Sequence, residues 1–415
     1  MKKSSSTILF FLLFNIGYGQ QSYNITFDHD GKIVYGTFTT PDGFARFPTI
    51  IINPGSGPGD RDGTNPLIGG NNACLFPGIY GDTLKPYKEL SNALVKAGYA
   101  VLRYDKLEYT YTSNLGVITF HKDWLPVESA IKYVKTRNDV DTSQIILIGH
   151  SEGSSLIPFI AKGRKDIKAL ISIAGPATPF DSIYAWQLPN LVKLLRPCGA
   201  TATDSINAQN QSNQILNYFN TIRSNTWNGG TPAFAGAPAS AWYDYIRAID
   251  STSINYNIDN LPTLFTGMGA DFQVPPTELQ RFKKEVTITK DFWSIPNLYH
   301  DMNSATNPHV SKILTDTIVY WLRQHKIVAG TANIQVGSNM IQIQPNPCNE
   351  YCKISFSKNE HQKSLISVKN IFGQTIMEIS TNQDLTLDSS RFPEGIYFIN
   401  INTNGKVITK KIIKQ

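Results

Sequence analysis

The sequence predicts an α/β fold with a mostly parallel sheet, followed by a small all-β sandwich. Between residues 23 and 324, short β-branched runs alternate with amphipathic helical stretches, a pattern typical of a parallel sheet covered by helices. Beyond residue 339 the hydrophobic period changes to two, which is typical of antiparallel strands. The 415 residues are 41% hydrophobic and 17% charged, a composition that excludes global disorder.

The larger body is expected to open with a β-hairpin, residues 23–27 and 32–39, which turns around Asp30 and Gly31. Apolar runs predict further buried strands at 49–53, 100–104, 145–148, 169–173 and 263–266. Helical periodicity is found at 84–97, 124–134 and 154–162, with a final helix at 311–322.

Two regions depart from this alternation. Residues 61–82 form a loop rich in Gly and Asn, and residues 176–259 lack a clear buried strand. The second region is expected to be a cap or lid inserted into the fold, although an ordered excursion without a role in substrate access is the alternative. The predicted catalytic domain is 20–328, followed by a linker at 329–338 and a β-domain at 339–415.

The N-terminus predicts export. Lys2 and Lys3 precede an apolar run at 8–14, and small residues follow at 17–19. The run is shorter than the ~20 residues that span a bilayer, so residues 1–19 are expected to be a cleaved signal peptide and no stable membrane span is expected. An uncleaved amphiphilic anchor is the alternative.

Charge and cysteine content exclude other classes. The net charge of +6 is mild and no dense basic run precedes the extreme C-terminus, so no nucleic-acid partner is expected. The four cysteines, at positions 74, 198, 348 and 352, allow three disulfide connectivities, which the sequence does not distinguish. Free buried thiols at Cys74 and Cys198 are the alternative. No metal site is expected at the cysteines, because no His lies near them at a zinc-like spacing.

The chemistry is predicted at Ser151, the centre of a G-x-S-x-G motif at residues 149–153. An apolar strand precedes the motif and a helix follows it, the strand-turn-helix context of a nucleophile elbow. The start of that helix directs backbone N–H groups at a forming oxyanion. A serine hydroxyl needs a base to take its proton, so a His and an orienting acid are expected later in the chain.

In this topology the acid follows a later strand and the His precedes the final helix. Asp271 follows the apolar run at 263–266 and a Gly-rich turn, whereas the rival acids Asp250 and Asp259 follow no strand. Of the histidines after the motif, His300 lies in the expected loop, and His309 is expected at the start of the final helix. Asp271 and His300 are therefore the predicted acid and base.

An oxyanion hole also needs a donor from the loop after the third strand. That loop, residues 54–63, is rich in glycine, and its Ser56 N–H, together with the Glu152 N–H, is the predicted donor pair. A phosphate cradle is not indicated because the G-x-x-x-x-G-K-[ST] spacing is missing. The reaction is expected to need no cofactor and no metal.

The catalytic body resembles the serine-aminopeptidase-like esterases of the α/β-hydrolase superfamily. The resemblance is carried by residues 55–58, 60–63, 97–106, 149–153, 267–271 and 298–300. It implies hydrolysis of carboxylic esters, usually with short acyl chains, by Ser151, Asp271 and His300. The chain departs from the family at 107–111, where Arg-Gly usually follows Asp-Lys.

The C-terminal segment resembles the sorting domain of the type IX secretion system. The resemblance is carried by residues 344–347, 368–374, 387–388, 392–398 and 410–415. It implies passage through the periplasm, recognition by an outer-membrane translocon, and a secreted or surface-attached enzyme. Cys348 and Cys352 depart from the family pattern, and a binding or spacer domain is the alternative.

Together these features predict a secreted serine carboxylesterase that acts through an acyl-enzyme on a small-molecule ester or an acylated polymer. Two alternatives remain open. A secreted peptidase of the same fold would need an anchor for a substrate amine, for which Glu108 and Glu128 are the candidates. The other is a non-catalytic binding module.

Overall fold

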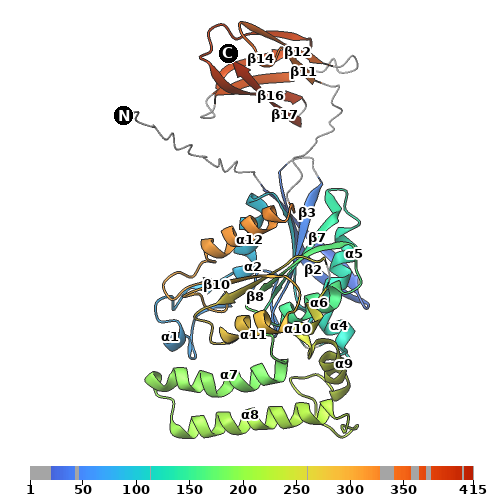
Figure 1. The fold of residues 1–415 in the computed structure, drawn as a ribbon, viewed down its shortest axis with the longest axis vertical. Helices are drawn as coiled ribbons and strands as arrows, with labels where there is room; N and C mark the ends of the chain where they lie inside the picture. Colours follow the sequence, from blue (N-terminus) through green and yellow to red (C-terminus); the bar gives the residue numbers. More distant parts are fainter. Residues whose placement is uncertain are drawn as a thin grey trace, which may run out of the picture. The chain divides into compact units, whose positions relative to one another are not determined.

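The computed structural model describes residues 20–42, 46–112, 114–258, 260–327, 341–356, 364–370, 375–403 and 406–414. The chain divides into two compact units, Met1–Thr331 and Ala332–Gln415, both drawn in Figure 1. The expected signal peptide at 1–19 and the expected linker at 329–338 lie outside the described residues.

The first unit is built on an eight-stranded sheet with the order β1-β2-β6-β3-β7-β8-β9-β10. Its strands are β1 (Gln20–His29), β2 (Lys32–Pro41), β3 (Phe47–Asn53), β6 (Ala100–Tyr104), β7 (Val140–His150), β8 (Ile167–Ile173), β9 (Thr263–Met268) and β10 (Asp291–Ile295). β2 pairs antiparallel with β1 and β6, and all other neighbours are parallel. The predicted mostly parallel α/β fold is confirmed.

Helices cover both faces of this sheet (Figure 1). The alternation along β3 shows why: Ile51 packs into one apolar core, while Ile50 and Ile52 pack into the other. The Ile51 side holds α5 (Pro126–Val134), α6 (Glu152–Ala161) and α11 (Thr277–Glu285). The opposite side holds α2 (Pro86–Lys96) and α12 (Lys312–Gln324).

Two local predictions need correction. The helix expected at 124–134 is broken at Leu125, which ends α4 (Phe120–Trp124) and precedes α5, because Pro126 has no N–H to continue the first helix. His309 does not begin the final helix, since Ser311 caps α12. The short elements of this unit are β4 (Asn65–Pro66), α1 (Asn72–Leu75), β5 (Thr83–Leu84) and α3 (Leu107–Thr110).

The region between β8 and β9 is helical. It contains α7 (Phe180–Leu195), the 3-10 helix η1 (Arg196–Cys198), α8 (Ala202–Arg223), α9 (Ala239–Ile249) and α10 (Thr252–Asn255). Figure 1 shows α7 and α8 side by side as a helical hairpin. Arg223 pairs with Asp181 of α7 and with Asp250 at the end of α9, so one guanidinium links three helices. Among the described residues, no helix is both long and apolar enough to cross a membrane.

A disulfide joins the two regions that departed from the strand–helix alternation. It links Cys74, in α1 of the Gly-rich loop, to Cys198, in η1 at the end of α7. Cys348 and Cys352 of the second unit are buried free thiols. One of the three possible connectivities pairs Cys74 with Cys198 and Cys348 with Cys352. The structure contains the first of these two bonds and not the second.

The second unit is all-β in its described residues. One sheet has the order β11-β12-β15 and the other the order β14-β13-β16-β17, and all pairings are antiparallel. The strands are β11 (Ile341–Gln344), β12 (Tyr351–Phe356), β13 (Ser364–Asn370), β14 (Thr375–Thr381), β15 (Leu385–Asp388), β16 (Gly395–Thr403) and β17 (Lys406–Lys414). Both sheets contribute to a single core that includes Cys352, Ile366 and Ile399. The predicted all-β domain is confirmed.

Candidate active site

Ser151 lies at a sharp turn between β7 and α6. Its backbone has φ 54° and ψ −124°, a strained conformation for a residue with a side chain. The flanking glycines are required by space: a methyl group at Gly153 would lie 2.3 Å from the carbonyl oxygen of Asn53, and one at Gly149 would lie 2.5 Å from that of Gly153. The motif therefore forms the predicted elbow geometry, with Ser151 partly exposed at its tip.

Asp271 and His300 come together at the same edge of the sheet as this turn. Asp271 follows β9 and His300 follows β10, neighbouring parallel strands whose carboxyl ends share one edge of the sheet. Oδ2 of Asp271 lies 2.7 Å from Nδ1 of His300, and both residues are buried. The other oxygen, Oδ1, accepts hydrogen bonds from the backbone N–H groups of Gln273 and Val274 at 2.8 and 2.9 Å. Both oxygens of the Asp271 carboxylate are therefore hydrogen-bonded.

This pairing changes the basicity of His300. Burial disfavours the imidazolium, but the negative charge and hydrogen bond of Asp271, with a contribution from Asp301, raise the pKa of His300 above its ordinary value. A proton on Nδ1 is donated to Asp271, which leaves Nε2 as the basic nitrogen. The pair can therefore present one oriented proton acceptor.

A second buried histidine holds His300 in place. The His150 ring lies 4.7 Å from the His300 ring between centroids, and its Nε2 lies 2.9 Å from the His300 carbonyl oxygen. Its Nδ1 lies 2.9 Å from the Tyr87 hydroxyl, which accepts from the Gly55 N–H at 3.0 Å. Burial, followed by the nearby charge of His300, lowers the pKa of His150 to about 4, so the ring is neutral. These hydrogen bonds form a continuous series from Gly55, in the loop after β3, through Tyr87 and His150 to the backbone of His300.

The predicted oxyanion donors border the same space as Ser151. Ser56, Glu152 and Ser151 line one cavity, and within the described part of the chain neither the Ser56 N–H nor the Glu152 N–H has a hydrogen-bond partner. The loop also passes close to the elbow, because a methyl group at Gly55 would lie 3.1 Å from Cβ of Ser151. Both N–H groups are therefore free to receive a ligand oxygen.

Ion pairs from the end of β6 hold the glycine-rich loop. Nε and Nη2 of Arg61 bond the two oxygens of Asp105 at 2.9 and 2.6 Å, and the Arg61 N–H also donates to this carboxylate. Arg103 in turn pairs with Asp62. A bidentate pair restricts geometry as well as adding attraction. These contacts explain why acidic and basic residues recur at 60–62 and 103–106.

The Glu152 side chain is buried beside its own N–H and is bound from three directions. Its Oε1 accepts from the Trp124 indole at 3.1 Å and from the Tyr245 hydroxyl at 3.0 Å, and its Oε2 lies 3.6 Å from Nζ of Lys106. The same Lys106 ammonium donates to the Gly55 carbonyl at 3.0 Å. Lys106 therefore contacts both the loop that carries Ser56 and the side chain of Glu152.

The cavity at Ser151 has a volume of about 260 Å³, and the helical region between β8 and β9 contributes much of its lining. Its apolar lining comes mainly from Phe180, Ile183 and Tyr184 of α7, with Phe234 and Tyr245. Among the lining residues that the structure describes, Glu152 is the one carboxylate. The arrangement can enclose a small substrate group with apolar or aromatic character next to the serine.

The remaining candidates lie apart from this constellation. Asp250 is paired with Arg223, and Asp259 lies outside the described residues. Glu108 contacts Lys106 at 3.4 Å and Glu128 contacts His121 at 3.3 Å, and neither lines the cavity at Ser151. Four residues of these contacts were not predicted from the sequence as parts of the site: Tyr87, His150, Lys106 and Tyr245. Two of them carried a local signal: His150 lies inside the elbow motif, and Lys106 lies in the 97–106 segment that carries the family resemblance.

Comparison with protein families agrees with this architecture. Residues 73–306, more than half of the chain, match the family described as serine aminopeptidase, S33. The chain belongs to the S33 family. Residues 342–415 match the secretion system C-terminal sorting domain. The two resemblances found in the sequence are thus confirmed, and the S33 chain carries a domain that directs secretion or surface export.

Among characterised proteins, this S33 chain is similar to Esterase EstD of Thermotoga maritima. The two are 27% identical over 300 residues, which is 69% of this chain and 65% of the length of that esterase. Solved structures with a similar chain path include the esterase domain of a Rhodothermus marinus protein, at 16% identity over 73% of this chain and 98% of that one, with a TM-score of 0.45. Another is Est1E from Butyrivibrio proteoclasticus with ferulic acid bound, at 17% identity over 73% of this chain and 99% of that one, also with a TM-score of 0.45.

Proposed function

We propose that this chain is an exported serine carboxylesterase that acts through Ser151, His300 and Asp271. The observation that carries the proposal is the buried His300–Asp271 pair at 2.7 Å, located at the same sheet edge as the strained Ser151 turn. Similarity to Esterase EstD supports ester hydrolysis rather than another reaction of this family.

In the proposed reaction, Nε2 of His300 takes the hydroxyl proton of Ser151 as Oγ attacks the ester carbonyl carbon. The backbone N–H groups of Ser56 and Glu152 stabilise the tetrahedral oxyanion. His300 then gives its proton to the departing alcohol, and an acyl group remains on Ser151. Water, activated by the same imidazole, releases the acid and restores the serine.

Asp271 acts in this scheme through its charge and its hydrogen bond. It stabilises the imidazolium that forms in each step and keeps the proton on Nδ1, so that Nε2 faces the reaction. The two backbone N–H groups that bind its other oxygen keep it oriented. No metal or organic cofactor takes part in any step.

The shape of the cavity supports a small ester with an apolar acyl or alcohol group. A volume of about 260 Å³ is small for a ligand site, and the aromatic cap residues give no charged partner to such a group. The proposed substrate is therefore a short-chain ester, either free or attached to a polymer.

A peptidase that recognises a substrate amine would need a free carboxylate at this cavity. Within the described part of the lining, the one carboxylate is that of Glu152, and it already interacts with Lys106, Trp124 and Tyr245. We therefore favour the esterase over the aminopeptidase alternative. A comparison of p-nitrophenyl butyrate with aminoacyl p-nitroanilides distinguishes the two, because a higher kcat/KM for the anilides would support the peptidase.

Export completes the proposal. The sorting domain at 342–415 supports delivery to the cell surface or the medium, and we propose a signal peptide at 1–19, passage through the periplasm, and a type IX outer-membrane translocon as the route. The catalytic domain would then be 20–328, joined by a linker at 329–338.

Ser151→Ala tests the chemical proposal, with Ser155→Ala as the matched control because Ser155 lines the same cavity. We expect Ser151→Ala to lose about 10⁴-fold or more in kcat and to stop reacting with a fluorophosphonate probe, while Ser155→Ala keeps both activities. Full ester turnover by Ser151→Ala would refute the nucleophile. Failure of the wild type to react with probe or ester would favour a binding module.

A further inference from the structure

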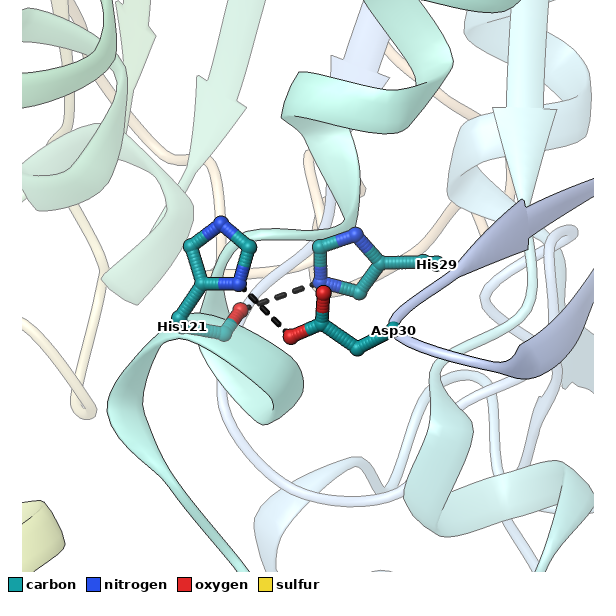
Figure 2. Close-up of side chains that lie close together, drawn as sticks. All are labelled: His29, Asp30 and His121. Carbon is teal, nitrogen blue, oxygen red and sulfur yellow. Dashed lines mark hydrogen bonds and ion pairs between the residues drawn. The ribbon is translucent and has the colours of Figure 1, made fainter.

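A cluster of metal-binding side chains lies on the catalytic unit outside the proposed hydrolase site. It consists of His29 at the end of β1, Asp30 in the turn that follows, and His121 of α4 (Figure 2). Each offers one ligand atom, and these atoms lie within 4.8 Å of one another. His29 is buried, whereas Asp30 and His121 are exposed, so an ion can reach the cluster from solvent.

The near nitrogens of both imidazoles are directed at the same region. Nδ1 of His121 lies 2.7 Å from Oδ2 of Asp30, and Nε2 of His29 lies 3.0 Å from the main-chain oxygen of His121. Figure 2 shows the Asp30 carboxylate between the two rings. The rings are stacked, with centroids 5.2 Å apart. Two imidazoles and one carboxylate are thus grouped as in the three-ligand sites that zinc and similar divalent metals occupy.

The far nitrogens have the partners that metal-bound histidines usually have. Nδ1 of His29 lies 2.9 Å from Oγ of Ser129, and Nε2 of His121 lies 3.3 Å from Oε2 of Glu128. In the structure, Nε2 of His29 donates to the main-chain oxygen of His121, so its lone pair becomes available to a metal once the proton moves to Nδ1, which can then donate to Oγ of Ser129. Glu128 and Ser129 are adjacent on α5, so one helix orients both rings.

We propose that His29, Asp30 and His121 bind a zinc-class divalent cation. His29 contributes Nε2, His121 contributes Nδ1 and Asp30 contributes a carboxylate oxygen, with water completing the tetrahedral shell on the exposed side. On binding, the His29 proton moves from Nε2 to Nδ1 and the hydrogen bond to the His121 carbonyl is replaced by the bond to the metal. His121 keeps its proton on Nε2, beside Glu128, and a proton on Nδ1, when present, is released to solvent. The carboxylates of Asp30 and Glu128 together balance the two positive charges.

The consequence of binding would be a cross-link between distant segments. Asp30 and His121 are separated by 91 residues, and the cation would fix the β1–β2 turn to α4 and α5. A cation that binds the folded chain and not the unfolded chain raises the melting temperature. The site uses no residue of the proposed hydrolytic reaction, so it stands independently of that reaction.

The test is zinc binding by the full-length chain after treatment with a chelator. Calorimetric titration with zinc chloride measures stoichiometry and Kd, and thermal melts with and without zinc measure stabilisation. The variants are His121→Ala and Asp30→Asn, which remove ligands on the exposed side, and Glu128→Gln, which weakens the partner of His121. His309→Ala is the matched control, because His309 is an exposed His paired with a single carboxylate, Glu89, at 2.9 Å.

We expect the wild type and His309→Ala to bind one zinc ion more tightly than the ligand variants do, and to melt at a higher temperature with zinc. His121→Ala and Asp30→Asn should bind at least ~100-fold more weakly, and Glu128→Gln about 10-fold to 100-fold more weakly. Ester hydrolysis without zinc should be the same in all variants. The difference between wild type and variants is the deciding measurement. Equal stoichiometry, Kd and melting shift in wild type, His121→Ala and Asp30→Asn would overturn the site.

Discussion

The Cys74–Cys198 disulfide is expected to be a major source of stability for the cap. Replacement of both residues by serine removes a cross-link between positions 124 residues apart. In the chain-entropy model, a closed loop of this length corresponds to about 5 kcal/mol at 25 °C, and measured values for native disulfides are usually about 2–4 kcal/mol. We therefore expect the free energy of unfolding to fall by about 2–5 kcal/mol.

The disulfide should also affect substrate binding. Cys198 ends the segment that begins with α7, and α7 supplies Phe180, Ile183 and Tyr184 to the cavity at Ser151. Loss of the disulfide should disturb the cavity more than the proposed catalytic residues, since the Ser151 turn, Asp271 and His300 lie at the edge of the sheet. KM for short esters is therefore expected to rise, with a smaller change in kcat.

Urea unfolding and ester kinetics on the same samples measure both effects. Wild type treated with dithiothreitol should resemble the Cys74→Ser/Cys198→Ser variant, and the reductant should not change the variant further. Cys348→Ser is a poor control because that thiol is buried in the second unit, so the reduced wild type serves instead. A loss below about 0.5 kcal/mol, with KM unchanged, would refute the reasoning.

Two further predictions concern the site itself. Asp271→Asn removes the charge that raises the pKa of His300, so the rising limb of the plot of kcat/KM against pH should move to lower pH. The maximum of kcat/KM should fall by about 10⁴-fold. An unshifted limb would contradict the assignment of the acid. Lys106→Met leaves the buried Glu152 carboxylate without its cation and should lower the free energy of unfolding in urea by about 3–5 kcal/mol. The double variant Lys106→Met/Glu152→Gln should recover most of this loss. Equal destabilisation in both variants would argue against the ion pair.

The fold was predictable where hydrophobic period and burial agree. The strands at the centre of the sheet, such as β3, consist of buried residues on both faces and therefore read as continuous apolar runs. β10 was not predicted, because it is the edge strand and most of it is exposed, including Trp293. The cap could be delimited by its lack of strands, but its helices are held by contacts between distant residues, such as Arg223 with Asp181, that no local pattern reveals.

The site was predictable in its order along the chain and not in its surroundings. Chain order and the strand ends were enough to select Asp271 and His300, which the structure brings within hydrogen-bond distance. The contacts of Lys106 with Gly55 and Glu152 join segments about fifty residues apart, and nothing in the spacing of these residues marks them as partners. Sequence order thus identifies the proposed reacting groups, whereas the groups that hold them depend on tertiary contacts.

The residues that contact the glycine-rich loop limit its flexibility. A glycine-rich loop suits an oxyanion hole because its backbone can approach a substrate, but the same freedom makes a fixed position of the Ser56 N–H costly in conformational entropy. Arg61 restrains the loop through Asp105, and Lys106 restrains it through the carbonyl of Gly55. Both restraints come from the rigid end of β6. Catalysis by fixed dipoles requires donors that do not reorganise during the reaction, so buried charges that add little net stability are well placed beside this loop.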